Sequence, residues 1–360
     1  MSTDVTATVN GIVSSLLTKD CTWHRWASLG SQLPLIAEAS PQAFLDAVRS
    51  DLKRPEPELA KLLTAEEDTL FGRCNHAGLL WALESLAWDA SRLSDVAESL
   101  LLLASRDVQK GRWANRPSTS LAEILLYWLP QTTATVQNRV ATLDRMLRTD
   151  ETTAWEILLT LLPHPARTVS TPTFRPYWRT WADDWKAGAT CNESDEFVEQ
   201  TAARVIRFAG TRIDRWRRIV ESLGCFPRAV QSDLLAGFDS LCSIEISDLD
   251  RRAIWDELSG QIQRLRRYGG SRVSAEILNH LEICRERLMP RNLSLAHAWL
   301  FDGHPDLFFD REGTGGYDQP ALDKARLDAL AEILGARGFE GILELLEHTS
   351  ASNGSWLVGV

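Results

Sequence analysis

The chain has 360 residues, of which 44% are hydrophobic and 24% are charged, a balance typical of a globular protein. Its net charge of −10 argues against nucleic acid as the main partner, and no apolar stretch is long enough to span a bilayer. The six cysteines form no C-x-x-C pair, and the first residues lack a signal-peptide pattern. We therefore expect a cytoplasmic protein with reduced thiols and no membrane contact.

Helical patterns dominate from end to end, and the alternation typical of strands is nearly absent. In the first half, the expected helices cover residues 9–17, 41–52, 78–88, 91–105, 120–129, 134–148 and 153–162. Residues 163–177 carry four prolines and should be irregular. In the second half, helices are expected over residues 196–208, 211–222, 228–242, 248–267, 273–288, 293–300, 321–335 and 339–348.

A tryptophan stripe follows the proline-rich stretch. Trp178, Trp181 and Trp185 have the spacing of one helix face. An aromatic stripe at helical spacing is usually part of a core, and we expect that here, with an exposed aromatic platform as the alternative.

An internal repeat connects two of these helices. Residues 120–130 and 153–163 both read S/T-x-x-E-I-L-L-x-x-L-P, and six of the eleven positions are identical. We expect Ser120 and Thr153 to cap the two helices, each with the following glutamate, Glu123 or Glu156, reaching back to the cap. Self-similarity at this spacing is typical of stacked helical repeats.

The sequence thus predicts an all-α protein, an irregular α-solenoid of antiparallel helix pairs of the HEAT-like or TPR-like kind. We expect an N-terminal helical-repeat region over 1–187 and a C-terminal helical region over 188–360, with a boundary near Gly188. From the apolar residues at the C-terminal end we expect that the chain continues into a longer protein, with docking of this end on its own core as the alternative.

Residues 79–88, Gly111-Arg-Trp-Ala-Asn-Arg-Pro117 and 120–132 resemble a block of very large bacterial proteins, some of which look like anti-phage ATPases of the signal-transduction type. The resemblance covers about residues 20–165, and 321–360 more loosely. It implies a helical-repeat tail of the kind that follows an NTPase module. This chain has no G-x-x-x-x-G-K-S/T motif, so nucleotide hydrolysis by that route is excluded.

The loop 111–117 is the most distinctive local motif. Trp113, Asn115 and Arg116 could form a recognition patch, since exposed Trp and Arg are typical hot-spot residues. The alternative is structural, with Trp113 between helix pairs and Arg116 capping carbonyls.

The stretch 201–292 is rich in arginine and holds 16 Arg against 12 acidic residues. We expect an acidic partner to bind here, and charge reversal at Arg215 and Arg218 to leave the melting temperature nearly unchanged. The alternative is a set of solvated helix faces. The candidate contact residues in this stretch are Arg212, Arg215, Arg218, Arg266 and Arg267.

Two groups contain residue types that bind metals. The first is Cys21, His24, Cys74 and His76, whose spacing matches no standard zinc knuckle. The second is a loop with Asp302, His304, Asp306, Asp310 and Glu312, which does not follow the EF-hand pattern. We expect neither to hold a metal, and we expect no cofactor.

No assembled catalytic motif is present, so we expect no enzymatic activity. The favoured function is protein–protein interaction, as a scaffold or sensor segment of a larger bacterial protein, with a role in anti-phage defence implied by the resemblance. The first alternative is a nucleic-acid-binding helical protein that uses the arginine-rich helices. The second is a metal-dependent enzyme that uses the 302–312 loop.

Overall fold

The computed structural model describes residues 2–17, 21–64, 74–107, 115–164, 172–183, 185, 188–268, 274–301 and 318–349. Over these residues the fold is all-α, as predicted, without a β-strand. The chain forms two units, Met1–Phe208 and Ala209–Val360. In the described ranges, no helix is long and apolar enough to cross a membrane.

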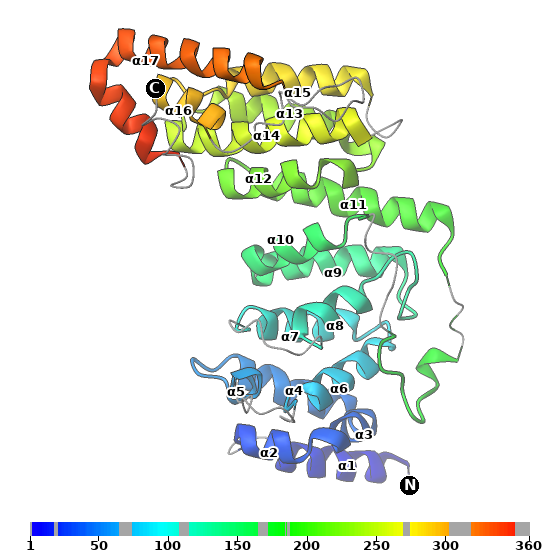
Figure 1. Ribbon diagram of the computed structural model, residues 1–360. Helices are drawn as coiled ribbons and strands as arrows, with labels where there is room; N and C mark the ends of the chain where they lie inside the picture. The colour runs from blue at the N-terminus through cyan, green and yellow to red at the C-terminus, as the bar shows by residue number, and fades with distance from the viewer. Residues whose placement is uncertain are drawn as a thin grey trace. The chain divides into compact units, whose positions relative to one another are not determined.

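The helices of the first unit alternate between two rows. Their bounds are α1 Ser2–Leu17, α2 Trp23–Ser28, α3 Leu33–Ala39, α4 Pro41–Leu52, α5 Glu58–Thr64, α6 Ala77–Ala87, α7 Leu93–Ala104, α8 Pro117–Ile124, α9 Val136–Thr149, α10 Glu151–Thr160 and α11 Cys191–Ala209. One row packs α1 on α4, α4 on α7 and α7 on α9, and the other packs α3 on α6, α6 on α8 and α8 on α10. Figure 1 shows these helices in successive layers from α1 to α10.

Helix α6 is central to this unit, because it contacts α3, α7 and α8. The apolar run predicted over 78–88 is buried on nearly every side, and Leu80, Leu83 and Leu86 have no exposed surface. Gly78 lies against the 3₁₀ turn Gly30–Gln32, where a Cβ atom would collide with the carbonyl group of Gly30. The packing therefore requires glycine at this position.

The two repeat copies differ from the predicted capped helices. Helix α8 begins at Pro117, so Ser120 lies inside it, and the Ser120 hydroxyl donates to Oε1 of Glu84 at 2.6 Å. Helix α10 is capped by Asp150, whose side chain accepts from the N–H of Thr153 at 3.1 Å. The prediction that Ser120 and Thr153 cap the helices is therefore wrong, although α8 and α10 do contact one another.

Arg139 on α9 explains why α8 stops at Ile124. The buried guanidinium donates to the carbonyls of Ile124 at 2.9 Å and Leu126 at 3.3 Å, and to the hydroxyl of Thr132 at 2.8 Å. These carbonyls belong to the stretch predicted as helix over 120–129, and Arg139 holds the chain there in an irregular path. Burial also lowers the pKa of Arg139 to about 10.

Helix α11 belongs to the first unit, so the division falls at 208/209, where the sequence analysis expected 187/188. Its contacts explain this position. The indole of Trp155 on α10 donates to the carbonyl of Val205 at 3.0 Å, and Arg204 binds both carboxylate oxygens of Asp144 on α9 at 2.7 and 2.8 Å. The hydrogen bond from Arg204 lowers the pKa of Asp144.

The second unit contains α12 Ile213–Glu221, α13 Gln231–Ser243, α14 Asp248–Tyr268, α15 Ala275–Arg287, α16 Leu293–His297 and α17 Gln319–Glu347. Helix α14 packs on α12, α15 and α16, whereas α13 packs on α15. Helix α17 bends at Gly338, whose φ of 62° lies in the left-handed region. The bend agrees with the predicted turn between helices 321–335 and 339–348 (Figure 1).

Candidate functional site

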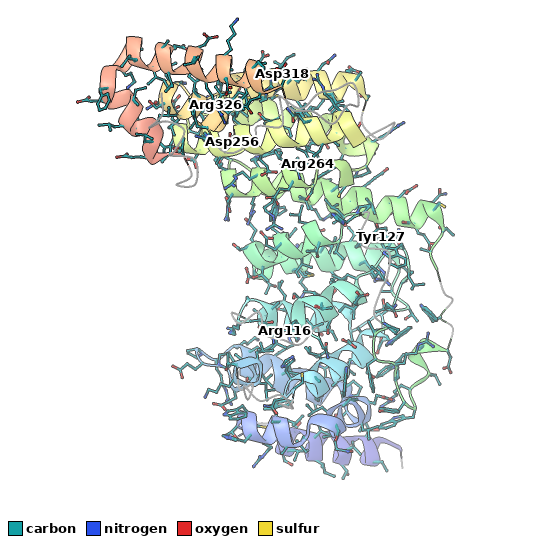
Figure 2. The ribbon with its side chains drawn as sticks, viewed as in Figure 1. Arg116, Tyr127, Asp256, Arg264, Asp318 and Arg326 are labelled. Atoms are coloured by element: carbon teal, nitrogen blue, oxygen red, sulfur yellow. The ribbon has the colours of Figure 1, made fainter. Side chains whose placement is uncertain are left out.

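The structure gives the 111–117 loop a structural role where it describes it. Trp113 lies outside the described residues. Arg116, which is labelled in Figure 2, is only 8% exposed. Its guanidinium binds both carboxylate oxygens of Asp107. The carbonyl oxygen of Asn115 lies 2.8 Å from Nε2 of the buried His76. Arg116 is therefore committed to an internal ion pair, which contradicts its prediction as a surface contact residue.

The arginine-rich stretch is largely balanced by acidic neighbours. Several of its arginines form ion pairs, namely Arg212–Asp214, Arg218–Glu221, Arg264–Glu257, Arg266–Glu282, Arg287–Asp239 and Arg291–Glu245. Arg215 is only 2% exposed, so it is part of the core of the second unit and is no surface contact, contrary to prediction. The side chain of Arg267 lies outside the described residues.

Burial of Arg215 also overturns the expectation that its charge reversal would leave the melting temperature unchanged. A carboxylate at a buried position would be desolvated, and that costs several kcal/mol in order of magnitude. Arg218 is about half exposed, so charge reversal at this residue alone is still expected to leave the melting temperature nearly unchanged.

Cys21, His24, Cys74 and His76 do not come together as a metal-binding group in the described ranges. Cys74 and His76 do meet, with Sγ and Nε2 3.3 Å apart, but Nε2 also contacts the Asn115 carbonyl. Cys21 is buried, which raises the pKa of its thiol. The 302–312 loop lies outside the described residues, so its predicted role is not tested.

The tryptophan stripe is not a helix. Residues 172–183 run as an extended segment with one 3₁₀ turn, Thr180–Ala182, and we call this segment the strap. The predicted irregular backbone before Trp178 therefore extends through the stripe. Trp178 is 52% exposed, which contradicts its expected place in the core.

Two buried glutamates hold the backbone of the strap. Glu38 on α3 has no exposed surface and accepts the N–H groups of Tyr177 at 2.6 Å, Trp178 at 3.0 Å and Arg179 at 3.2 Å. Glu84 on α6 accepts the N–H of Phe174 at 2.8 Å. These carboxylates satisfy backbone donors that an extended segment cannot pair within itself.

Burial raises the pKa of Glu84, and the hydrogen bonds from Ser120 and Phe174 act in the opposite direction. Desolvation is the largest effect, because Glu84 is 7% exposed. Glu84 therefore connects the strap to α8 at the cost of keeping a carboxylate in the interior.

Aromatic side chains fix the strap from its other side. The guanidinium of Arg175 lies over the rings of Trp88 and Trp185, 5.0 and 4.4 Å from their centroids, and the two rings also contact each other edge to face at 5.6 Å. The Trp88 indole donates to the Phe174 carbonyl at 3.0 Å, and the Trp185 indole donates to the Pro130 carbonyl at 2.7 Å. Such contacts fix both the backbone and the side chains of the strap.

Exposed aromatic side chains lie on and beside the strap. We call them the aromatic face: Trp81 and Tyr177, which are joined through the half-buried Phe174, and the exposed Trp178 next to Tyr177 in the sequence. Tyr177 is 63% exposed, Trp178 52% and Trp81 40%. The ring of Phe174 stacks on Trp81 at 5.7 Å and meets the edge of Tyr177 at 5.4 Å. The face therefore combines exposed aromatic surface with an anchored backbone.

A pocket of about 290 Å³ lies in the same unit, between the irregular stretch after α8 and the start of α11. Its aromatic walls are Tyr127, Trp185 and Phe197, and the rings of Tyr127 and Phe197 stack at 6.0 Å. Figure 2 labels Tyr127 in this region. Arg139 and Glu193 also line the pocket.

A second group of functional side chains lies between α13 and α15. Nε2 of His280 is 3.2 Å from Oδ2 of Asp239, and Sγ of Cys284 is 3.9 Å from Oδ1 of Asp239. Sγ of Cys242 is 3.7 Å from the carbonyl oxygen of Cys284. The hydrogen bond between the two thiols lowers the pKa of Cys242 and raises that of Cys284.

This second group was not predicted from the sequence, although the sequence contains a signal for it. Asp239 and Cys242 are three residues apart on one predicted helix, and His280 and Cys284 are four apart on another. Each pair therefore shares a helix face. Only the packing of α13 on α15, which lie on either side of α14 in the sequence, brings the pairs together.

No family model matches the chain, and comparisons with curated proteins and with solved structures also give no match.

Proposed function

We propose that this protein is a helical-repeat scaffold that binds a protein partner through the aromatic face. The observation that carries the proposal is the pairing of exposed Tyr177 and Trp178 with backbone N–H groups that are fixed by the fully buried Glu38. Binding hot spots are rich in Trp and Tyr. Because the backbone is already ordered, less entropy is lost on association.

The packing of the first unit supports a solenoid as the architecture of the scaffold. Two rows of helices, α1–α4–α7–α9 and α3–α6–α8–α10, follow one another in chain order. Solenoids of this kind present extended surfaces to other proteins. The strap crosses both α3 and α6 through Glu38 and Glu84, so it adds an aromatic surface to the repeat stack.

The sequence resembles repeat tails of large bacterial proteins. We therefore include in the proposal that the chain is a segment of a larger cytoplasmic protein that acts in anti-phage defence. The nucleic-acid alternative is less well supported, because arginines 212, 218, 264, 266, 287 and 291 have acidic partners. Paired charges attract phosphate less than free ones do.

A photo-crosslinking experiment tests the proposal. A photoreactive amino acid replaces Trp178 in the full chain, expressed in the cells that naturally make the protein, and a matched variant carries it at Ile12, an exposed apolar residue of α1. We expect a specific protein adduct from position 178 that is absent from position 12, and that is reduced by Tyr177→Ala. Identical adducts from both positions, or none from position 178, would refute the proposal.

A further inference from the structure

The side chains of Asp239, Cys242, His280 and Cys284 offer four donor atoms from two helices, and we call them the α13–α15 cluster. One donor atom each from Asp239, His280 and Cys284 lies within 4.8 Å of the other two. Cys242 lies beside this group of three: its Sγ is 3.7 Å from the backbone carbonyl oxygen of Cys284. The i,i+3 and i,i+4 spacings place each pair on one helix face, and the packing of α13 on α15 makes those faces meet.

The distances are close to those of a tetrahedral metal site. With Zn–S of about 2.3 Å and Zn–N or Zn–O of about 2.0–2.2 Å, the ligand atoms of a tetrahedral zinc site lie roughly 3.3–3.8 Å apart. Nε2 of His280 lies 3.2 Å from Oδ2 of Asp239, and Sγ of Cys284 lies 3.9 Å from Oδ1 of Asp239, both just outside this range. One carboxylate oxygen of Asp239 lies within 4.8 Å of both other donor atoms. A single ion can therefore reach these three donors with little movement of the side chains.

The imidazole of His280 supplies an independent observation. Its Nε2 atom is buried, yet it makes no hydrogen bond of acceptable geometry, although Asp239 is only 3.2 Å away. A buried polar atom without a hydrogen bond is costly to the fold. A cation between imidazole and carboxylate would satisfy both groups, since neutral imidazole is a common metal ligand.

We propose that Asp239, Cys242, His280 and Cys284 bind one zinc ion, which joins α13 to α15. Two thiolates, one imidazole and one carboxylate form a donor set that zinc takes in proteins. With Cys242 as the fourth ligand, all four positions of the ion would be filled by protein, as in a structural zinc site. The proposal does not depend on the partner-binding function of the aromatic face.

Arg287 fits this site as a positioning residue. Its guanidinium lies 3.1 Å from Oδ1 of Asp239, which leaves Oδ2 for the metal. Carboxylates that bind metals are commonly held by such hydrogen bonds from a second group. Two thiolates and one carboxylate carry three negative charges, and Zn²⁺ with Arg287 balances them.

The test uses the full chain, purified without chelators, reduced with a phosphine and supplied with Zn²⁺. We expect one equivalent of bound zinc by elemental analysis. Replacement of zinc by Co²⁺ should give the charge-transfer band of thiolate–cobalt bonds and the strong visible bands of a tetrahedral site. The variants are His280→Ala and Cys242→Ala, because both side chains are partly exposed and the fold should tolerate their loss.

Competition with a chromogenic chelator then gives the zinc affinity. We expect His280→Ala and Cys242→Ala to bind zinc at least tenfold more weakly, and Arg287→Met about tenfold more weakly, in line with the loss of groups that support metal ligands. Cys225→Ala, a cysteine of the same unit outside the cluster, is the matched control and should bind like the wild type. Zinc should also raise the melting temperature of the wild type and not that of His280→Ala.

Two results would overturn the proposal. One is a reduced wild-type chain that takes up no zinc and gives no thiolate–cobalt band, or whose uptake is unchanged in His280→Ala and Cys242→Ala. The other is a Cys242–Cys284 disulfide in the isolated protein, found by mass spectrometry of unreduced peptides, together with no metal binding after reduction. That result would make the cluster a thiol pair instead of a metal site.

Discussion

The carboxylate of Glu38 accepts the backbone N–H of Tyr177 at 2.6 Å, across 139 residues of sequence. Glu38 lies on α3 and is fully buried, whereas the Tyr177 side chain is one of the most exposed aromatic groups of the described residues. The buried Glu38 side chain thus fixes the backbone of Tyr177, whose exposed ring is part of the proposed binding surface. Carboxylates that accept backbone N–H groups form some of the stronger hydrogen bonds in proteins.

Glu38→Ala should release the strap from α3. It removes the acceptor of three N–H groups, and we expect a loss of about 2–4 kcal/mol in the free energy of unfolding, since buried donors without partners are costly. Trypsin should also cut faster after Arg179, whose next residue is Thr180. Denaturant unfolding and timed proteolysis measure both effects. The exposed Glu340→Ala is the control, and equal behaviour of the two variants would show that Glu38 does not hold the strap.

Arg139→Met should destabilise the first unit more than any surface arginine substitution. Methionine preserves much of the side-chain volume and removes donors to Ile124, Leu126 and Thr132, which leaves buried carbonyls without partners. We expect a loss of about 3 kcal/mol or more in the free energy of unfolding. Chemical denaturation of Arg139→Met beside Arg218→Met measures the difference, and a loss below that of Arg218→Met would contradict the assigned role.

Glu84→Gln should change the pH dependence of stability. Because burial raises the pKa of Glu84 in the folded state, its protonated form favours folding, and that contribution is lost as the pH rises through the folded-state pKa. Gln keeps an acceptor for the Phe174 N–H and can donate to the Ser120 hydroxyl.

The stability of Glu84→Gln relative to the wild type should therefore be higher at pH 8 than at pH 4. Unfolding curves at both pH values test this, with Glu340→Gln as the control for the loss of one surface charge. A relative stability that falls with rising pH would mean that Glu84 is better stabilised as a carboxylate than its burial indicates.

Gly78→Ala and Gly11→Ala should act in opposite directions. A Cβ atom at Gly78 would collide with the backbone of Gly30, so alanine forces α6 away from the 3₁₀ turn, at a cost of about 1–3 kcal/mol. Gly11 lies in α1 with nothing near its Cβ position, so alanine should stabilise by roughly 0.5–1 kcal/mol. The melting temperatures of both variants test these two predictions. Destabilisation by Gly11→Ala would contradict the exposed position of Gly11 on α1.

The sequence predicted helix bounds well where both the apolar period and the residues that begin and end a helix were present. Helix α4 spans the predicted 41–52, with Pro41 at its first turn, and α14 follows the predicted 248–267 to within one residue. The short helices α2, α3 and α5 were missed, because six or seven residues do not establish a helical period. The tryptophans over 178–185 have the spacing of a helix face, but this segment is not an α-helix. The prolines before it correctly indicated an irregular backbone.

The candidate sites depend on contacts that no local pattern carries. The strap is held by Glu38 and Glu84, which are far from it in sequence, and no pattern in the residues around them indicates these contacts. Arg116 and Arg215 look like exposed charges in the sequence, yet both are buried. The α13–α15 cluster needs two helices separated by α14 to pack together. Long-range packing therefore decides which polar residues are available for binding.

The most direct test of the central proposal measures the affinity of the full chain for the protein that crosslinks at position 178. Isothermal titration calorimetry compares the wild type with Trp178→Ala and with the control Ile12→Ala. Because central aromatic contacts commonly contribute 2 kcal/mol or more, we expect Trp178→Ala to weaken binding at least about 30-fold and Ile12→Ala to change it little. Equal affinities for the wild type and Trp178→Ala, with both chains folded, would contradict binding through the aromatic face.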